Sequence, residues 1–349
     1  MKKAKTLYKK LDKNTVQCRA CNWYCKIKEG NVGICGVRQN NSGELCLLVD
    51  GKIISLAVDP IEKKPLFHFL PASKTLSFGT LGCNFGCAFC QNWQQSQGIK
   101  GKLWLLLNYS EVRRSLDFAR DDKTPKEIVE KAEKLGCESI AYTYNEPTIF
   151  VEYAYETMKL AKKAGIKNVW VSNGFMSDES FELIKDLIDG INIDLKSINS
   201  DFYRKICKGK LEPVLKNIKK FYKAGIWIEL TTMIIAGEND SPAELKKIAE
   251  FIANLSCDIP WHVTAFHPDY KMMDKEATSL EKLEEAWQIG KKSGLKYIYT
   301  GNVWGGKNST YCVECGNLLI DRGDYGSGKV LGLADGKCEE CGQKISGAW

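Results

Sequence analysis

The spacing of the cysteines is the feature that most constrains this chain. Of its fifteen cysteines, all but Cys46, Cys137, Cys207 and Cys257 fall into three groups, and we expect those four to be small buried side chains. No apolar run is long enough to cross a bilayer, and the start, MKKAKTLYKKLDKN, lacks the apolar core of a signal peptide. We therefore expect a cytoplasmic protein, in which thiols bind metals rather than form disulfides.

The middle group is compact and has three members. Cys83, Cys87 and Cys90 lie in LGCNFGCAFCQNW, with the spacing CxxxCxxC on a loop rich in glycine. Three thiolates on a four-iron cluster leave one iron without a protein ligand, and an open coordination position indicates chemistry rather than a structural role. Phe89, directly before the third cysteine, is expected to lie against the cluster and line a cofactor pocket.

The C-terminal group resembles a zinc ribbon. It consists of two CxxCG turns, YCVECG and CEECG, which carry Cys312, Cys315, Cys338 and Cys341. In such a turn two thiolates reach one metal, and the glycine relieves the tight backbone after the second ligand. Four thiolates can also hold an iron–sulfur cluster, but small closed sulfur sites usually hold zinc.

The N-terminal group has looser spacing. Cys18, Cys21, Cys25 and Cys35 lie within CRACNWYCKIKEGNVGICGVR. They could form a second zinc site, hold an auxiliary cluster, or contribute ligands to the C-terminal ribbon. We favour zinc for this group.

Downstream of the middle group, β-rich runs alternate with helical patterns. The expected strands are 76–79, 139–144, 168–172, 191–195, 226–235 and 260–266. Helix starts are predicted at Thr124 before Pro125, at Ser177, and at Ser241 before Pro242. About six βα units predict an α/β protein with a partial (β/α)6 TIM-like barrel at residues 71–305. A cysteine-rich metal-binding region at 1–70 and a zinc-ribbon-like module at 306–349 complete the predicted domains.

Catalytic groups of such barrels lie at the carboxyl ends of the strands. Polar residues follow five consecutive predicted strands, although Asp, Asn and Gly are also ordinary strand terminators. The segments are Tyr144–Pro147, Ser172–Gly174, Asp194–Lys196, Gly237–Asp240 and His267–Pro268.

The motif CxxxCxΦC, with Φ aromatic, after the strand KTLSFGT resembles the signature of the radical S-adenosylmethionine (radical SAM) superfamily. The resemblance implies a site-differentiated [4Fe–4S] cluster on Cys83, Cys87 and Cys90. S-adenosylmethionine would bind the open iron, and reduction would yield a 5′-deoxyadenosyl radical that abstracts hydrogen. It further implies an enzyme with an electron donor such as ferredoxin or flavodoxin.

The resemblance also implies cofactor contacts at the strand ends. The segment NEP, with Asn145 and Glu146, resembles the GGEP segment that recognises the methionyl amino group, although Tyr144 and Asn145 replace its glycines. Ser172 and Asn173 resemble the segment near the ribose and carboxylate. Asp194 and Lys196 resemble the DxK of glycyl-radical activating enzymes, and Lys196 could pair with the methionyl carboxylate. His267, after the sixth strand, completes the expected contacts.

Motifs along almost the whole chain resemble the AmmeMemoRadiSam-system radical SAM enzymes, relatives of the pyruvate formate-lyase activating enzymes. They include DPIEKKPLFHFLP, TLGCNFGCAFCQNWQQSQ, IAYTYNEPT and HVTAFHPDYKM. The resemblance implies Memo-like and AMMECR1-like partner proteins and, more weakly, a protein or peptide substrate. Residues 98–123 do not fit the pattern, and we interpret them as an insertion.

Two other functions stay open. One is a glycyl-radical activase, whose substrate is a glycine of a partner enzyme. The other is a non-enzymatic iron–sulfur or zinc scaffold that binds RNA, suggested by the net charge of +7 and the CxxCG turns, and expected to be salt-sensitive. We rank it well below catalysis, because a scaffold does not need an open iron.

Overall fold

The computed structural model describes the whole chain apart from residues 1, 5, 13, 99, 101–121 and 324–327. Its contacts divide it into two compact units. Unit 1 comprises Met1–Val58 and Thr75–Asp189, and unit 2 comprises Asp59–Lys74 and Gly190–Trp349. The expected insertion at 98–123 lies almost entirely outside the described residues, and the three domain boundaries remain predictions.

Three parallel strands form the centre of unit 1. They are β8 (Lys74–Gly79), β9 (Ser139–Tyr142) and β10 (Lys167–Ser172). Strand β9 pairs with both of its neighbours, and Ser139 is the register partner of Thr75 and of Lys167. All three strands were predicted. Because they are parallel and in register, the segments that follow them emerge at one edge of the sheet.

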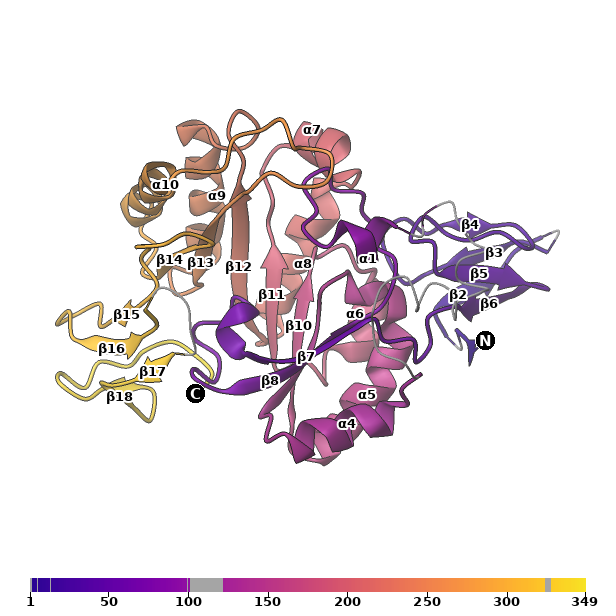
Figure 1. Ribbon diagram of the computed structural model, residues 1–349, viewed down its shortest axis with the longest axis horizontal. Coiled ribbons are helices and arrows are strands. Elements are labelled where there is room, and N and C mark those ends of the chain that lie inside the picture. The colour runs from indigo at the N-terminus through magenta and orange to yellow at the C-terminus, as the bar shows by residue number, and fades with distance from the viewer. Residues whose placement is uncertain (1, 5, 13, 99, 101–121, 324–327) are drawn as a thin grey trace. The chain divides into compact units, whose positions relative to one another are not determined.

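Helices cover these strands, and α4 and α6 begin where the sequence indicated. They are α1 (Trp93–Gln97), α4 (Pro125–Lys134), the 3₁₀ turn η2 (Pro147–Phe150), α5 (Val151–Lys163) and α6 (Asp178–Ile184). Thr124 caps α4 in a reciprocal capping box with Glu127, and Ser177 caps α6. Helices α4 and α5 lie side by side (Figure 1). Phe78 of β8 meets Tyr153 of α5 edge to face, with ring centroids 6.0 Å apart, so aromatic packing joins α5 to the strands.

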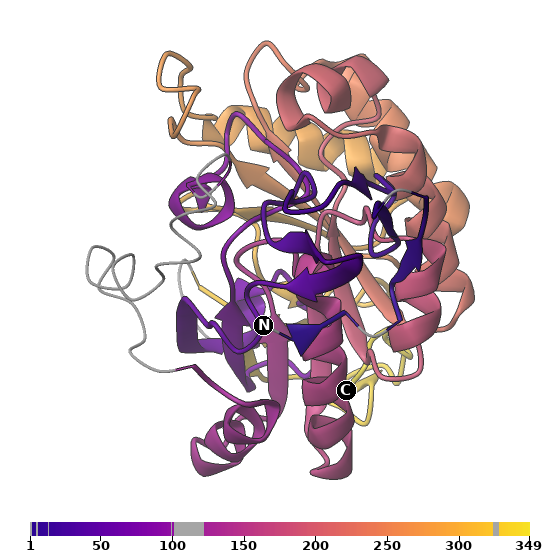
Figure 2. The same cartoon turned by 90° about the vertical axis from the view of Figure 1, so that its right-hand side faces the viewer.

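The N-terminal region of unit 1 consists of short antiparallel strands, shown in indigo in Figure 2. One sheet has β1 (Lys2–Lys3), β6 (Glu44–Leu47) and β5 (Arg38–Asn41), and another has β2 (Tyr8–Lys10), β3 (Val16–Cys18) and β4 (Lys26–Ile27). The strand β7 (Ser55–Pro60) leads out of this region. These strands are too short to produce a periodic pattern, and the sequence did not predict them.

Unit 2 continues the alternation of parallel strands and helices. Its strands are β11 (Gly190–Asp194), β12 (Trp227–Ile234), β13 (Trp261–Ala265) and β14 (Ile298–Gly301). Its helices are η1 (Ile61–Lys63), α7 (Ser200–Phe202), the π-helical turn η3 (Tyr203–Cys207), α8 (Leu211–Lys223), α9 (Pro242–Leu255) and α10 (Leu280–Lys292). Ser241 caps α9 and Pro242 begins it, as predicted. Strand β14, parallel to β13, adds a strand to the predicted set.

The C-terminal segment, yellow in Figure 1, folds into short hairpins. Its strands are β15 (Thr310–Tyr311), β16 (Leu318–Asp321), β17 (Lys329–Val330), β18 (Leu333–Ala334) and β19 (Lys337–Cys338). Leu319, Ile320 and Ile345 share a small core with Cys312 and Cys338. Cysteines therefore form part of the packing of this segment.

Parallel strands that alternate with helices in both units confirm the predicted α/β fold class. No helix in the described part of the chain is both long enough and apolar enough to span a membrane.

Candidate functional site at the strand ends

The loop that carries Cys83, Cys87 and Cys90 runs between β8 and α1. None of the three forms a disulfide within the described part of the chain. The main-chain N–H of Phe85 donates to the Cys83 sulfur at 3.5 Å, and the Cys90 sulfur lies 3.1 Å from the Ser96 hydroxyl. Hydrogen bonds to sulfur are one of the means by which proteins stabilise cluster ligands and set their potentials. Burial raises the pKa of the Cys83 thiol to about 12, although the nearby charge of Lys100 opposes this rise.

The side chain of Asn145 holds the start of this loop in place. Its amide nitrogen donates to the main-chain oxygen of Gly82 at 2.7 Å, and its amide oxygen accepts from the N–H of Thr80 at 3.2 Å. Gly79 makes this close approach possible, because a Cβ there would lie 2.5 Å from the Thr143 oxygen and 3.0 Å from Asn145. In this structure Asn145, a predicted cofactor contact, binds the start of the loop that carries Cys83, Cys87 and Cys90.

The buried carboxylate of Glu146 connects the ends of β9 and β10. It accepts hydrogen bonds from the main-chain N–H groups of Thr148 at 3.0 Å and Asn173 at 2.7 Å. The Ser172 hydroxyl lies 2.9 and 3.0 Å from its two oxygens. Burial raises the pKa of Glu146, and these hydrogen bonds oppose the rise. The structure thus brings Glu146, Ser172 and Asn173 together, as expected.

Asn173 extends this network to the cysteine loop. Its amide nitrogen donates to the side-chain oxygen of Asn84 at 2.8 Å. The amide nitrogen of Asn84 is buried and finds no acceptor among the residues that the structure describes. Asn84 was not among the predicted site residues, although it directly follows Cys83 in the sequence.

Tyr144 adopts the backbone conformation that glycine favours. Its φ of +66° lies in the left-handed region, which is costly for a bulky residue. Its main-chain oxygen accepts a 2.9 Å hydrogen bond from the Asn92 side chain. The replacement of glycine noted in the sequence therefore preserves a glycine-like turn at this position.

The donor set fits a [4Fe–4S] cluster. Three cysteines outside any disulfide share one short loop, and the sulfurs of Cys83 and Cys90 receive polar contacts. The buried amide donor of Asn84 beside them has no acceptor among the described residues. A cluster sulfide or a bound polar cofactor is an acceptor of the kind that such a donor needs. Phe89 is buried, and its contact with the cluster and cofactor stays a prediction.

The remaining predicted contacts belong to unit 2. Asp194 ends β11, and its carboxylate pairs with Lys196 at 2.8 Å. The buried Asn239 donates to the main-chain oxygen of Lys196 at 2.7 Å and accepts from the N–H of Ile235 at 2.7 Å. Asn239, which belongs to the predicted strand-end segment Gly237–Asp240, therefore fixes the backbone at Lys196. His267 is exposed just after β13.

The C-terminal cysteines converge as predicted. Their four sulfurs lie within 4.8 Å of one another, and the pairs Cys312–Cys341 and Cys315–Cys338 are each 3.6 Å apart. A tetrahedral zinc site with bonds of about 2.3 Å would place its sulfurs about 3.8 Å apart. Gly316 and Gly342 follow the two turns with φ of +75° and +74°, which is the glycine role expected there. These four thiols alone supply as many ligands as a tetrahedral zinc ion takes.

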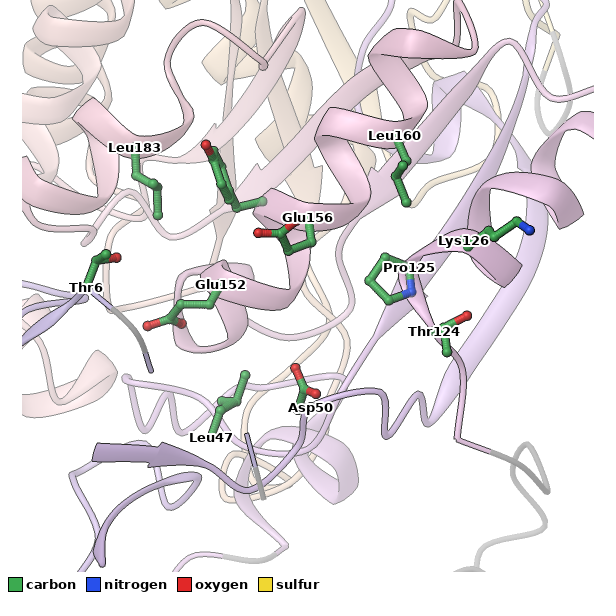
Figure 3. Close-up of a pocket in the computed structure, with 11 residues that line it drawn as sticks. Thr6, Leu47, Asp50, Thr124, Pro125, Lys126, Glu152, Glu156, Leu160 and Leu183 are labelled. Atoms are coloured by element: carbon green, nitrogen blue, oxygen red, sulfur yellow. The ribbon is translucent and has the colours of Figure 1, made fainter. Parts of the chain in front are cut away.

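A separate cavity of about 500 Å³ lies in unit 1 and is shown in Figure 3. Asp50, Glu152, Glu156 and Lys126 line it together with apolar side chains such as Leu47. It contains none of the predicted site residues.

Comparison with known proteins adds independent information. The family model described as the radical SAM superfamily matches residues 78–252. An uncharacterized protein of Methanocaldococcus jannaschii is 43% identical over 343 residues, which are 97% of this chain and 97% of that protein. The trans-4-hydroxy-L-proline dehydratase activating enzyme of Clostridioides difficile is 26% identical over 157 residues, 42% of this chain and 52% of that enzyme.

Among solved structures, that of Streptococcus suis SuiB bound to the precursor peptide SuiA has a TM-score of 0.50 at 14% identity. The match covers 70% of this chain and 52% of SuiB. It concerns the fold alone.

Proposed function

Because the chain belongs to the radical SAM superfamily, we propose that Cys83, Cys87 and Cys90 hold a [4Fe–4S] cluster whose open iron binds S-adenosylmethionine. When reduced, such a cluster cleaves this cofactor to methionine and a 5′-deoxyadenosyl radical that abstracts hydrogen from a substrate. Membership of the superfamily makes the chain an enzyme. The observation that carries the proposal is the loop itself, which holds three cysteines that form no disulfide beside the amide nitrogen of Asn84, for which the described residues offer no acceptor.

The chain's own residues would position the cofactor. Glu146 orders the ends of β9 and β10, because it holds the N–H of Asn173 and the hydroxyl of Ser172. Asn173 in turn holds Asn84 beside the cysteines. We assign these residues a positioning role at the methionyl and ribose groups, and we assign Lys196 the methionyl carboxylate.

We further propose that the C-terminal cysteines bind a structural zinc ion. Support comes from their separations, which match a closed tetrahedral thiolate site that leaves no position for substrate. The binding energy would order a segment whose own apolar core is small.

A glycyl-radical activase is the second candidate. It is favoured by the similarity to the hydroxyproline dehydratase activating enzyme, and it would make a glycine of a partner enzyme the substrate. Electron delivery would come from a ferredoxin or flavodoxin. Memo-like and AMMECR1-like proteins are the partners to test for a protein or peptide substrate.

Anaerobic incubation with dithionite and S-adenosylmethionine tests the proposal. We expect slow formation of 5′-deoxyadenosine and methionine without substrate, because cofactor cleavage needs only an electron at the cluster. Cys87→Ala should abolish the product, whereas Cys257→Ala, at a cysteine outside the three groups, should not. S-adenosylhomocysteine as the sole product under every reducing condition would refute radical chemistry.

A further inference from the structure

The N-terminal cysteines gather around one space although they come from separate segments. Cys18 ends β3, Cys25 directly precedes β4, and Cys35 lies in the turn before β5. Cys21 forms an isolated β-bridge with Met176. All four line a single cavity, and all four are free thiols. Binding of a metal or an iron–sulfur cluster explains why four thiols converge without forming disulfides.

The N-terminal thiols stand too far apart for one zinc ion. Within the described ranges, only the C-terminal cysteines place three or more ligand atoms within 4.8 Å of one another. Four sulfurs at about 2.3 Å from one zinc ion would lie about 3.8 Å apart. The wider spacing of the N-terminal quartet suits thiolates that each bind a different iron of a cluster.

A buried cation lies beside this cavity. Arg38 lines it, is 1% exposed, and places its Nη1 atom 4.0 Å from the Cys18 sulfur. Its Nε donates to the main-chain oxygen of Ile149 at 2.9 Å, and its Nη1 donates to Glu152 at 3.0 Å. Glu152 lies at the separate cavity of Figure 3. A fixed guanidinium next to four thiols suits an anionic group, because it offsets the charge of thiolates removed from water.

The cysteine loop also contacts the proposed catalytic loop. Trp23, between Cys21 and Cys25, donates from its indole nitrogen to the main-chain oxygen of Asn84 at 2.8 Å. Its ring lies 5.3 Å from that of Phe175, which in turn lies 5.1 Å from that of Phe85. The two cysteine loops are therefore joined by hydrogen bonding and aromatic packing.

We propose that Cys18, Cys21, Cys25 and Cys35 ligate a second iron–sulfur cluster of the [4Fe–4S] type. Each iron then has a cysteine ligand, so this cluster has no open position and does not bind the cofactor. This site replaces the zinc that the sequence alone favoured. This inference uses different cysteines from those of the proposed function, so either proposal can be refuted without the other.

Metal analysis of the anaerobically purified full chain tests this inference. The wild-type protein should contain about eight irons and about eight acid-labile sulfides, from two four-iron clusters. Cys87→Ala should retain about four irons, and the double variant Cys25→Ala/Cys35→Ala should lose about four. Cys46→Ala, at a buried cysteine of the same region that does not line the cavity, is the matched control and should keep all eight.

The iron content of the Cys87→Ala protein tests for the second cluster even if the double variant does not fold. Its remaining iron should give the Mössbauer signature of a four-iron cluster. A Cys87→Ala protein without iron would overturn the inference and leave the proposed function intact. A double variant that keeps its iron but loses one zinc would overturn it as well. If instead Cys87→Ala kept all the iron while the double variant lost all of it, the proposed function would fail and the inference would stand.

Discussion

The indole nitrogen of Trp23 donates a 2.8 Å hydrogen bond to the main-chain oxygen of Asn84, the residue that follows Cys83. A tryptophan of the N-terminal region thereby fixes the loop on which the proposed catalytic cluster is built. The two residues are 61 positions apart in the sequence, so no local sequence pattern predicts this hydrogen bond.

Trp23→Phe isolates the contribution of this bond. The substitution keeps an aromatic ring against Phe175 but removes the donor, so we expect the free energy of unfolding to fall by about 0.5–1.5 kcal/mol. Thermal or denaturant unfolding under anaerobic conditions measures it. Trp304→Phe, at a tryptophan that is 69% exposed, is the control and should change stability by less than about 0.5 kcal/mol.

Glu146→Gln should disturb the junction of β9 and β10. The amide nitrogen of glutamine would face the N–H groups of Thr148 or Asn173, which now donate to the carboxylate. We expect a loss of about 1–3 kcal/mol of stability and weaker S-adenosylmethionine binding by calorimetry, with the iron content unchanged. Glu133→Gln, on the exposed face of α4, should alter neither quantity. A Glu146→Gln protein with wild-type stability would show that the carboxylate's hydrogen bonds are not required.

Stability should fall in mild acid because of His68. Its Nδ1 lies 2.7 Å from the Ser346 oxygen and its Nε2 lies 2.6 Å from the Tyr299 hydroxyl. This geometry suits a neutral imidazole that donates from Nδ1 and accepts at Nε2. Burial lowers the pKa of His68 to about 4.

An unfolded chain protonates His68 near pH 6.5. The folded state therefore loses stability as the pH falls from about 6.5 to about 4, by at most about 1.4 kcal/mol per pH unit from this group. Denaturant unfolding across this range should show the slope, and His68→Asn should flatten it. An unchanged slope in His68→Asn would contradict the assignment.

Removal of zinc should destabilise the C-terminal segment. Cys315→Ser should lower the zinc content by about one ion per chain and should expose Leu319 and Ile320 to solvent exchange, because their small core includes cysteine side chains. Hydrogen exchange of residues 310–349 together with zinc analysis measures both effects. Cys257→Ser is the control. Iron in place of zinc at Cys315 would refute the zinc assignment.

The sequence predicted the elements whose signals are local. Thr124 and Ser241 cap helices where a capping residue precedes proline, and the buried strands match their apolar runs. Local sequence patterns did not predict which partners the polar side chains at the strand ends contact. Asn145 was expected to contact the cofactor, yet it reaches Gly82, 63 positions away. Which partner a strand-end side chain meets depends on loop packing, and one sequence does not encode that in any short pattern.

Lys196 offers the sharpest test of the cofactor contacts. Its ammonium group pairs with Asp194 at 2.8 Å, and its side chain is only 14% exposed. Lys196→Ala should weaken S-adenosylmethionine binding about ten- to a hundredfold, since one charge-assisted contact contributes about 1.5–3 kcal/mol. Iron content should not change, because lysine is not a cluster ligand.

The control is Lys296→Ala, because Lys296 also forms a 2.8 Å ion pair, with Asp258, but its side chain is 44% exposed. It should bind the cofactor as the wild type does. Asp194→Asn separates the two possible roles of the pair. If Lys196 only stabilises the end of β11 by pairing with Asp194, then Lys196→Ala and Asp194→Asn should lower the melting temperature equally and leave cofactor affinity alone. If Lys196 holds the carboxylate of the cofactor, Asp194→Asn frees its charge, so affinity should stay the same or rise while only Lys196→Ala reduces it.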